Sequence, residues 1–230
     1  MEFLNTEKRV DTTEIAYIID GFKAGTIKDG DKVTVKGTIH RIKEMSGFAF
    51  VIIRTARQQF QCIWEEGKSA IDVKDFSVEE CVVIDGTLIA EERSRLGFDI
   101  RIDNMTRISG KAEIPPVEIG NDRKMEKLNL ATLLDNRIVS LRNPKIRAIL
   151  KIADGVQYAF RSFLREEGFT EFVPPKMVES GAEGGADMFE VDYFGNKAYL
   201  NQSPQMYKQI MVGVFQKVYT VGPVFRAEKY

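Results

Sequence analysis

Hydrophobic and polar residues alternate with a period of two in five short segments of the first half of the chain. This period places successive side chains on opposite faces of a β-strand. Apolar residues at helical spacing precede them between Thr12 and Ala24, where Thr12 or Thr13 is the expected N-cap. Five short strands broken by glycines and polar runs predict a small all-β Greek-key barrel of the oligonucleotide-binding (OB) type, with an N-terminal helix. The expected strands are 33–42, 48–53, 60–64, 81–89 and 98–108, with a helical stretch near 73–80.

The alternation ends near Ser109, and residues 109–132 contain Gly110, Pro115-Pro116 and mixed charge. Such composition is typical of a connection between domains. We therefore predict a barrel domain at 1–108, a linker at 109–132 and an α+β region at 133–230 with an antiparallel sheet and flanking helices. That region should begin with a long helix from Asn143-Pro144 to Gly168. Further expected elements are strands at 170–173, 197–200, 218–221 and 224–228, and a helix near 204–215.

The composition is that of a globular protein, with 43% hydrophobic and 29% charged residues. No apolar run approaches the roughly 20 residues that span a bilayer, and the first residues lack the apolar core of a signal peptide. A cytoplasmic protein without a membrane partner is expected. Cys62 and Cys81 lie in apolar strand-like runs, which suits reduced thiols. With His40 as the single histidine, neither a zinc site nor a Ser/His/Asp triad is expected, and we assign no metal ligand within the chain.

The first half also carries features suited to RNA. Six basic residues and one acid lie between Lys32 and Gln61, which fits either a solvated sheet surface or an RNA-binding one. Phe48 and Phe50 are two apart on one expected strand, and Gln61 lies on the next. An exposed aromatic ring can stack a base and an amide can read its Watson–Crick edge. A strand phenylalanine is equally a common core residue, so the pattern alone leaves both roles open.

The second half contains Gln202-Ser203-Pro204-Gln205-Met206-Tyr207-Lys208-Gln209 at the start of an expected helix. Free backbone N–H groups and the helix dipole favour an anion there. In Phe225-Arg226-Ala227-Glu228, the arginine and glutamate are two apart and would share one face of a strand. Together the segments predict a site for a small zwitterion beside a polyphosphate. A solvated helix start and a surface ion pair are the alternatives.

These segments resemble the class II aminoacyl-tRNA synthetases, and within them the aspartyl enzymes of the archaeal and eukaryotic type. The resemblance implies an aspartate–tRNA ligase, which activates L-aspartate with ATP and Mg²⁺ to aspartyl-adenylate and passes the acyl group to the 3′ end of tRNA(Asp). It also implies a homodimer in the complete enzyme. The segments that carry the resemblance are 134–137, 168–175, 183–185, 202–209 and 225–228.

The resemblance also implies roles for single residues. Phe50 and Gln61 match the aromatic and amide that contact the anticodon, Lys43 matches a basic residue nearby, and Phe48 remains an expected core residue. Pro175 would lie at the dimer interface. The amino acid and ATP would be held by Glu183 on the α-ammonium, Ser203 and Gln205 elsewhere on aspartate, Lys208 on the β-carboxylate, Arg226 on the α-phosphate and reacting carboxylate, and Glu228 near adenine or magnesium.

The chain departs from the family pattern at Leu133 and Pro174, and the glycine-rich third motif with its γ-phosphate arginine does not occur in these 230 residues. We therefore expect the chain alone to be incomplete and inactive. Two alternatives follow: a catalytically inert RNA-binding or regulatory protein, and an asparaginyl relative. Asparaginyl enzymes typically carry glycine at the place of Pro204 and no lysine at the place of Lys208, which favours the aspartyl reading.

Overall fold

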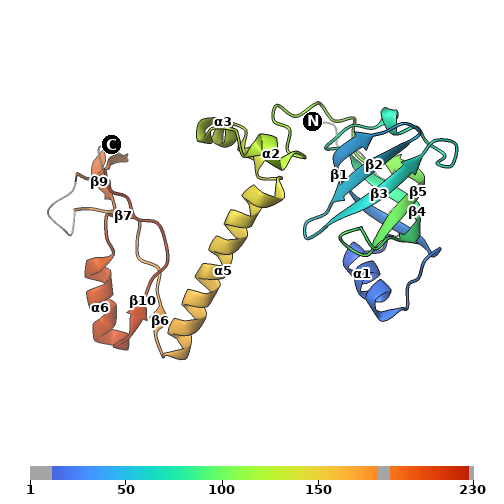
Figure 1. Cartoon of the computed structure of the whole chain (residues 1–230). Helices are drawn as coiled ribbons and strands as arrows, with labels where there is room; N and C mark the ends of the chain where they lie inside the picture. Colours follow the sequence, from blue (N-terminus) through green and yellow to red (C-terminus); the bar gives the residue numbers. More distant parts are fainter. Residues whose placement is uncertain (1–11, 181–186, 228–230) are drawn as a thin grey trace. The chain divides into compact units, whose positions relative to one another are not determined.

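The computed structural model describes residues 12–180 and 187–227. The chain divides into two compact units, Met1–Ile146 and Arg147–Tyr230, and each is described by itself. Figure 1 shows the barrel of the first unit and the long helix α5 (Pro144–Glu166), which continues into the second.

The first unit contains the predicted five-stranded barrel, closed in the order β1-β2-β3-β5-β4. All its pairs are antiparallel except β3 with β5, which run parallel. The helix α1 contributes Ile15, Ile18 and Ile19 to the barrel core. The OB-type fold is thus confirmed. Its elements are α1 Ile15–Ala24, β1 Lys32–Glu44, β2 Phe48–Arg54, β3 Gln59–Glu65, the 3-10 helix η1 Val73–Asp75, β4 Cys81–Ala90 and β5 Phe98–Arg107.

Two local predictions in this unit are wrong. Glu14, not a threonine, occupies the N-cap of α1, and no side chain caps it. The helix expected near 73–80 is one turn of 3-10 helix, because the backbone at Phe76 is extended. The ring of that extended residue lies 5.0 Å from the Arg107 guanidinium, a cation–π contact.

A buried ion network lies beside the barrel core. Arg54 donates to Glu79 through both terminal nitrogens, at 2.9 and 3.1 Å, and its Nη1 lies 3.1 Å from His40 Nδ1. Arg142 also pairs with Glu79. Arg54 is therefore buried and adds no charge to the surface, so the basic excess read from the sequence is smaller on the actual surface.

The segment 109–146 is more ordered than its composition suggests. It forms the short helices α2 Asp122–Met125, α3 Leu130–Asp135 and α4 Arg137–Ser140, and Asn121 and Asn129 cap the first two. Val117, Ile119 and Met125 form a second small core. A Cβ at Gly120 would lie 2.6 Å from the His40 carbonyl oxygen, so only glycine permits this approach to the barrel.

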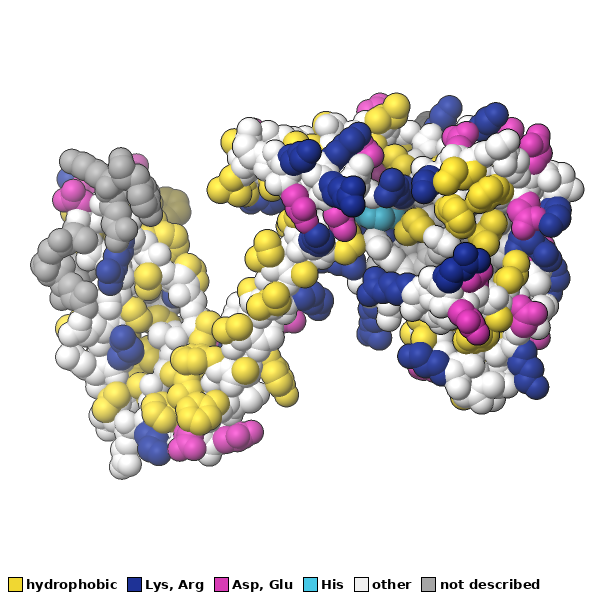
Figure 2. Space-filling view, in the orientation of Figure 1, with side chains coloured by type: hydrophobic (Ala, Val, Ile, Leu, Met, Phe, Trp, Pro, Cys, Tyr) yellow, Lys and Arg dark blue, Asp and Glu magenta, His cyan; other side chains and the backbone are white. Residues whose placement is uncertain are grey.

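The second unit is built on α5 Pro144–Glu166, which begins as predicted: Asn143 Oδ1 accepts from the backbone N–H groups of Lys145 and Ile146. The strands β7, β9 and β8 form an antiparallel sheet, and β10 pairs with β6 in parallel. Figure 2 shows hydrophobic side chains along α5, where Ile149, Val156 and Phe163 are exposed. The remaining elements are β6 Thr170–Glu171, β7 Met177–Val178, β8 Glu190–Tyr193, β9 Asn196–Leu200, α6 Gln205–Phe215 and β10 Val218–Tyr219.

The strand expected at 224–228 is absent from its described part, residues 224–227. Phe225 N–H donates to Asn201 O and Ala227 N–H donates to Asp187 O, so the segment contacts two separate stretches and forms no ladder. The hairpin of β8 and β9 was not predicted. Its turn places Phe194 and Gly195 at φ of +52° and +80°, the signature of a type I′ turn.

Candidate functional site

The outer face of the barrel brings together the three residues expected to bind the anticodon. Lys43 on β1 lies opposite Phe50 on β2, and Ile52 lies opposite Gln61 on β3. Opposite residues of an antiparallel pair project from the same face. Lys43, Phe50 and Gln61 therefore lie on neighbouring strands of one surface.

Phe48 shares this surface with Phe50, so its expected place in the core is wrong. The two ring centroids are 5.4 Å apart and the rings are perpendicular. Alternation along β2 explains the correction: Ala49 and Val51 point inward and are fully buried, which turns Phe48 and Phe50 outward. The face thus carries an aromatic pair where one ring was expected.

Two hollows flank this aromatic pair and Gln61. One, of about 380 Å³, is lined by Phe48, Phe50 and Ile63, by Ser46 and Gly47 of the turn before β2, and by Glu65 and Glu66. The other, of about 190 Å³, is lined by residues that include Gln59, Gln61, Arg93 and Arg95. Apolar rings, amides and guanidinium groups are the groups that bind single-stranded nucleic acid.

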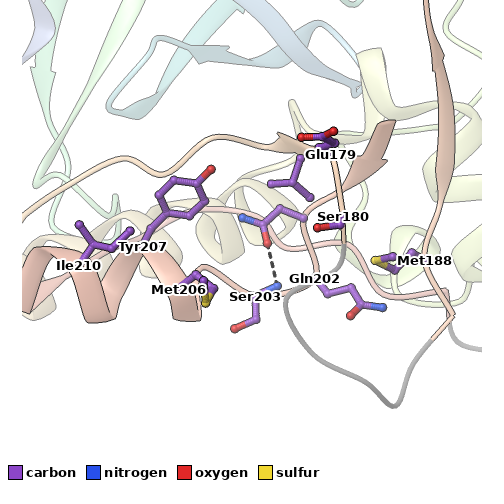
Figure 3. Close-up of a pocket in the computed structure, with 10 residues that line it drawn as sticks. Glu179, Ser180, Met188, Gln202, Ser203, Met206, Tyr207 and Ile210 are labelled. Atoms are coloured by element: carbon purple, nitrogen blue, oxygen red, sulfur yellow. Dashed lines mark hydrogen bonds between the residues drawn. The ribbon is translucent and has the colours of Figure 1, made fainter. Parts of the chain in front are cut away.

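The second unit contains a pocket of about 460 Å³ between β7, the loop 201–204 and α6. Figure 3 shows Tyr207 and Ile210 on α6 and Glu179 and Ser180 after β7 around it. The pocket combines apolar side chains with polar groups that could orient a ligand, as small-molecule sites do. Its apolar residues are Val178, Met188, Met206 and Ile210, and its polar residues are Glu179, Ser180, Asn201, Gln202, Ser203 and Tyr207.

The residues expected to hold aspartate and ATP are only partly gathered at this pocket. Ser203 lines it, whereas Gln205 and Lys208 are exposed on α6 and are not among the lining residues. Arg226 is exposed and likewise outside the lining. Glu183 and Glu228 lie outside the described residues. In the first unit, Lys43, Phe50 and Gln61 are placed as above, and Pro175 is exposed at the end of the segment that follows β6.

Asn201 connects three segments of the candidate site and was not predicted. Its side chain donates to Pro175 O at 3.0 Å and accepts from Ser203 N–H at 3.0 Å, the bond drawn as a dashed line in Figure 3. Its backbone donates to Lys176 O and accepts from Phe225 N–H. One buried residue thereby fixes the segment of Pro175, the Gln202–Gln209 motif and the segment of Arg226.

Some of the other pocket residues could be predicted from a sequence pattern, and some could not. Met206, Tyr207 and Ile210 follow helical spacing along α6, so periodicity could have found them. Gln202 is buried, and its Nε2 donates to Asp187 O at 3.2 Å. Glu179 and Ser180 carry no sequence signal, because only the pairing of β7 with β9 brings them to the pocket.

We expect Asn201→Ala to destabilise the second unit by about 1–3 kcal/mol, because Pro175 O and Ser203 N–H would lose their partner. Urea unfolding followed by circular dichroism at 222 nm measures this, since α5 and α6 supply much of the helical signal. Asn196→Ala, at the exposed start of β9, is the matched control. Equal midpoints for the two variants would contradict the bracing role of Asn201.

The described residues contain neither a metal-binding cluster nor a helix that could span a membrane. No group of three or more His, Cys, Asp or Glu residues within 12–180 and 187–227 is placed to hold a metal ion. Over the same residues, no helix is both long and apolar enough to cross a bilayer.

Comparison with known proteins gives a separate family match for each of two parts of the chain. Residues 33–110 match the OB-fold nucleic acid binding domain of the tRNA anticodon type, and residues 129–230 match the tRNA synthetases class II (D, K and N). The chain is 41% identical to the aspartate–tRNA(Asp/Asn) ligase of Deinococcus radiodurans over 203 residues, covering 88% of this chain and 45% of that protein. It is 36% identical to the aspartate–tRNA(Asp) ligase of Pyrococcus furiosus over 208 residues, covering 88% of this chain and 47% of that protein.

Among solved structures, asparaginyl-tRNA synthetase from Pyrococcus horikoshii in complex with asparaginyl-adenylate aligns with a TM-score of 0.76 and 30% identity. The alignment covers 88% of this chain and 46% of that one. The chain thus spans about half the length of the relatives it matches. An anticodon-type OB barrel followed by a synthetase-type α+β unit with this level of identity leads to one conclusion: the chain belongs to the class II tRNA synthetases of the D, K and N group.

Proposed function

We propose that this protein acts as an aspartate–tRNA ligase, which forms aspartyl-adenylate from L-aspartate and ATP and transfers the aspartyl group to tRNA(Asp). The observation that carries the proposal is the segment Gln202–Gln209, which borders the pocket of the second unit and includes both Pro204 and Lys208. A neutral asparagine side chain would leave the Lys208 ammonium unpaired, whereas aspartate would pair with it.

The chemistry requires no side-chain nucleophile. The substrate carboxylate attacks the α-phosphorus of ATP in line and pyrophosphate leaves, so the protein contributes positioning and charge stabilisation. Ser203 and Gln205 would orient the amino acid, Glu183 would hold its α-ammonium, and Arg226 would neutralise charge at the α-phosphate. Glu228 would position the adenine end of ATP. Mg²⁺ accompanies ATP in such reactions, but the described residues offer no cluster to hold it, so we assign no step to the ion.

The proposed partners follow from the two units. Lys43, Phe50 and Gln61 would contact the tRNA anticodon, and the exposed apolar stripe of α5 with Pro175 would form a homodimer interface. We propose functional boundaries at 1–108 for the anticodon-binding domain, 109–132 for the linker and 133–230 for the catalytic part. We also propose a cytoplasmic location, where the tRNA partner is aminoacylated.

An asparaginyl activity is the second candidate, because the structural alignment includes an asparaginyl enzyme with its adenylate. A ligase that charges both tRNA(Asp) and tRNA(Asn) with aspartate is a related possibility raised by the Deinococcus radiodurans relative. Amino-acid-dependent exchange of pyrophosphate into ATP distinguishes the aspartyl from the asparaginyl activity: aspartate should support exchange and asparagine should not. Charging assays with purified tRNA(Asp) and tRNA(Asn) distinguish a ligase for tRNA(Asp) alone from one that charges both.

If the protein has only a noncatalytic RNA-binding role, the barrel should bind RNA and the second unit should bind neither the amino acid nor its adenylate. Binding of an anticodon stem-loop together with no binding of L-aspartate or of an aspartyl-adenylate analogue, in a protein that also contains the third family motif, would favour that role over the ligase.

We expect Phe50→Ala to weaken binding of the tRNA(Asp) anticodon stem-loop by about 1–3 kcal/mol, the contribution of one base stacked on an aromatic ring. Fluorescence anisotropy at one fixed salt concentration measures it, because phosphate contacts make affinity salt-dependent. Tyr17→Ala on α1 is the matched control, an exposed aromatic of the same unit outside this face. Identical affinities for the Phe50 variant and the wild type would refute the stacking role.

A further inference from the structure

Asp99 on β5 is a buried carboxylate with an incomplete set of partners. Only 2% of its surface is exposed, and its Oδ2 accepts a hydrogen bond from Gln61 Nε2 at 3.0 Å. Its Oδ1 is buried and has no hydrogen-bond partner among the described residues. A buried carboxylate with one neutral partner and an unsatisfied oxygen costs stability. Asp99 is therefore poorly explained as a stabilising residue, and its single partner indicates what it does.

The carboxylate decides which end of the Gln61 amide faces outward. The hydrogen bond from Gln61 Nε2 to Asp99 Oδ2 holds the amide nitrogen of Gln61, and not its oxygen, toward the carboxylate. Neighbouring residues on β3 and β5 pair in parallel at Cys62 and Ile100, which sets Gln61 beside Asp99. The oxygen Oε1 is then directed away from Asp99, which does not itself line the 190 Å³ hollow that Gln61 lines.

A buried polar group of the same hollow also lacks a hydrogen-bond partner among the described residues. Gln59 lines it together with Gln61, and Gln59 Nε2 is buried without a hydrogen-bond partner among the described residues. Arg93 and Arg95 lie at the same hollow and supply positive charge. An acceptor, a donor and two guanidinium groups match the edge and phosphate of one nucleotide.

We propose that Asp99 is a positioning residue that fixes Gln61 as a hydrogen-bond acceptor toward the RNA, so that the site selects a base with a ring imino N–H. The ring nitrogen at the centre of the Watson–Crick edge carries hydrogen in uracil and guanine, and a lone pair in cytosine and adenine. A fixed acceptor distinguishes these two pairs, whereas a freely rotating amide, which can present either end, does not. The inference rests on the proposed function, since it assumes that this face binds the anticodon.

The first test uses the unaltered protein. An aspartate anticodon has guanosine first and uridine second, as the aspartate codons require. Three stem-loops are compared by anisotropy: unmodified, with 1-methylguanosine at the first position, and with 3-methyluridine at the second. One of the methylated stem-loops should bind about 5- to 10-fold more weakly, the effect of one lost hydrogen bond. In Gln61→Ala that difference should disappear. Equal binding of all three stem-loops by the wild type would overturn the proposal.

The second test removes the constraint on Gln61. Asp99→Asn has the same shape, but its amide can donate as well as accept, so Gln61 can turn. The penalty for the methylated base should fall to about 2-fold or less in this variant. Asp103→Asn, on the same strand and bonded to Lys32 and Thr87 instead, should keep the full penalty. A full penalty in Asp99→Asn would overturn the proposal.

Two controls separate the possible failures. Combining Asp99→Asn with Gln61→Ala should leave base discrimination as it is in Gln61→Ala alone, because Asp99 acts through Gln61. A merely structural role would add a further effect and would count against the proposal. Fluorescence of Trp64 reports whether each barrel is folded, and the wild-type comparison decides the matter if Asp99→Asn does not fold. No binding of any stem-loop would refute the anticodon contact itself, whereas binding without imino selectivity would refute the role of Asp99 alone.

Discussion

In an active enzyme that contains these residues, Lys208→Met should weaken the affinity for aspartate and leave the affinity for ATP unchanged. The substitution retains an apolar stem of similar length but removes the ammonium that would pair with the β-carboxylate. Truncating one partner of a desolvated charge pair costs about 2–5 kcal/mol, a loss of about 30- to 5,000-fold in affinity. Aspartate-dependent exchange of pyrophosphate into ATP, measured over a range of aspartate and of ATP concentrations, gives the two apparent affinities separately.

The position of Lys208 makes this a demanding test. Lys208 is exposed on α6 next to Tyr207, which lines the pocket, and its long flexible stem must bring the ammonium to the substrate. Lys197→Met is the matched control, because Lys197 is an exposed lysine of the same unit that pairs with Glu190. If the Lys208 variant kept its affinity for aspartate, or if the wild type preferred asparagine, the aspartyl assignment would be wrong.

The second large effect concerns the barrel. Glu79→Gln should lower the free energy of unfolding at neutral pH by about 3–5 kcal/mol, because it leaves the buried Arg54 guanidinium without its counter-charge. Urea unfolding followed by the fluorescence of Trp64, the only tryptophan and a barrel residue, measures it. Glu91→Gln is the control, since Glu91 forms an exposed pair with Arg93. Matching stabilities of the two variants would show that the network contributes no net stability.

The same network sets a pH dependence. Burial alone would raise the pKa of Glu79, but hydrogen bonds and charges from Arg54 and Arg142 outweigh it and hold that pKa below the ordinary value of 4.5. A depressed pKa in the folded state means that the stabilisation is complete above about pH 4.5 and is lost as pH falls through the folded pKa. The wild-type barrel should therefore lose stability below that pH more steeply than Glu79→Gln. Parallel acid profiles would contradict this assignment.

The barrel and the outward-facing residues of its proposed RNA-binding surface were largely predictable from the sequence. Period-two alternation determines which side chains of a strand share a face, so the spacing of Phe50 and Gln61 along their strands is enough to place both outward. The same alternation places Phe48 outward as well, so its expected place in the core contradicts that rule. The helix α5 was equally predictable, because Asn143 and Pro144 form a local cap and Gly168 adopts a positive φ of +81° at its end.

Local sequence therefore determined the five barrel strands and their faces, the helix α5 and the motifs of the class II family, since each depends on residues that lie close together in the chain. Tertiary structure alone decided the contacts between distant segments. Asn201 meets Pro175 and Phe225, Gln61 meets Asp99, and Arg54 meets Glu79 only because separate strands and loops are brought together. No periodicity encodes such pairs, because a hydrogen bond depends on position in space and not on spacing along the chain.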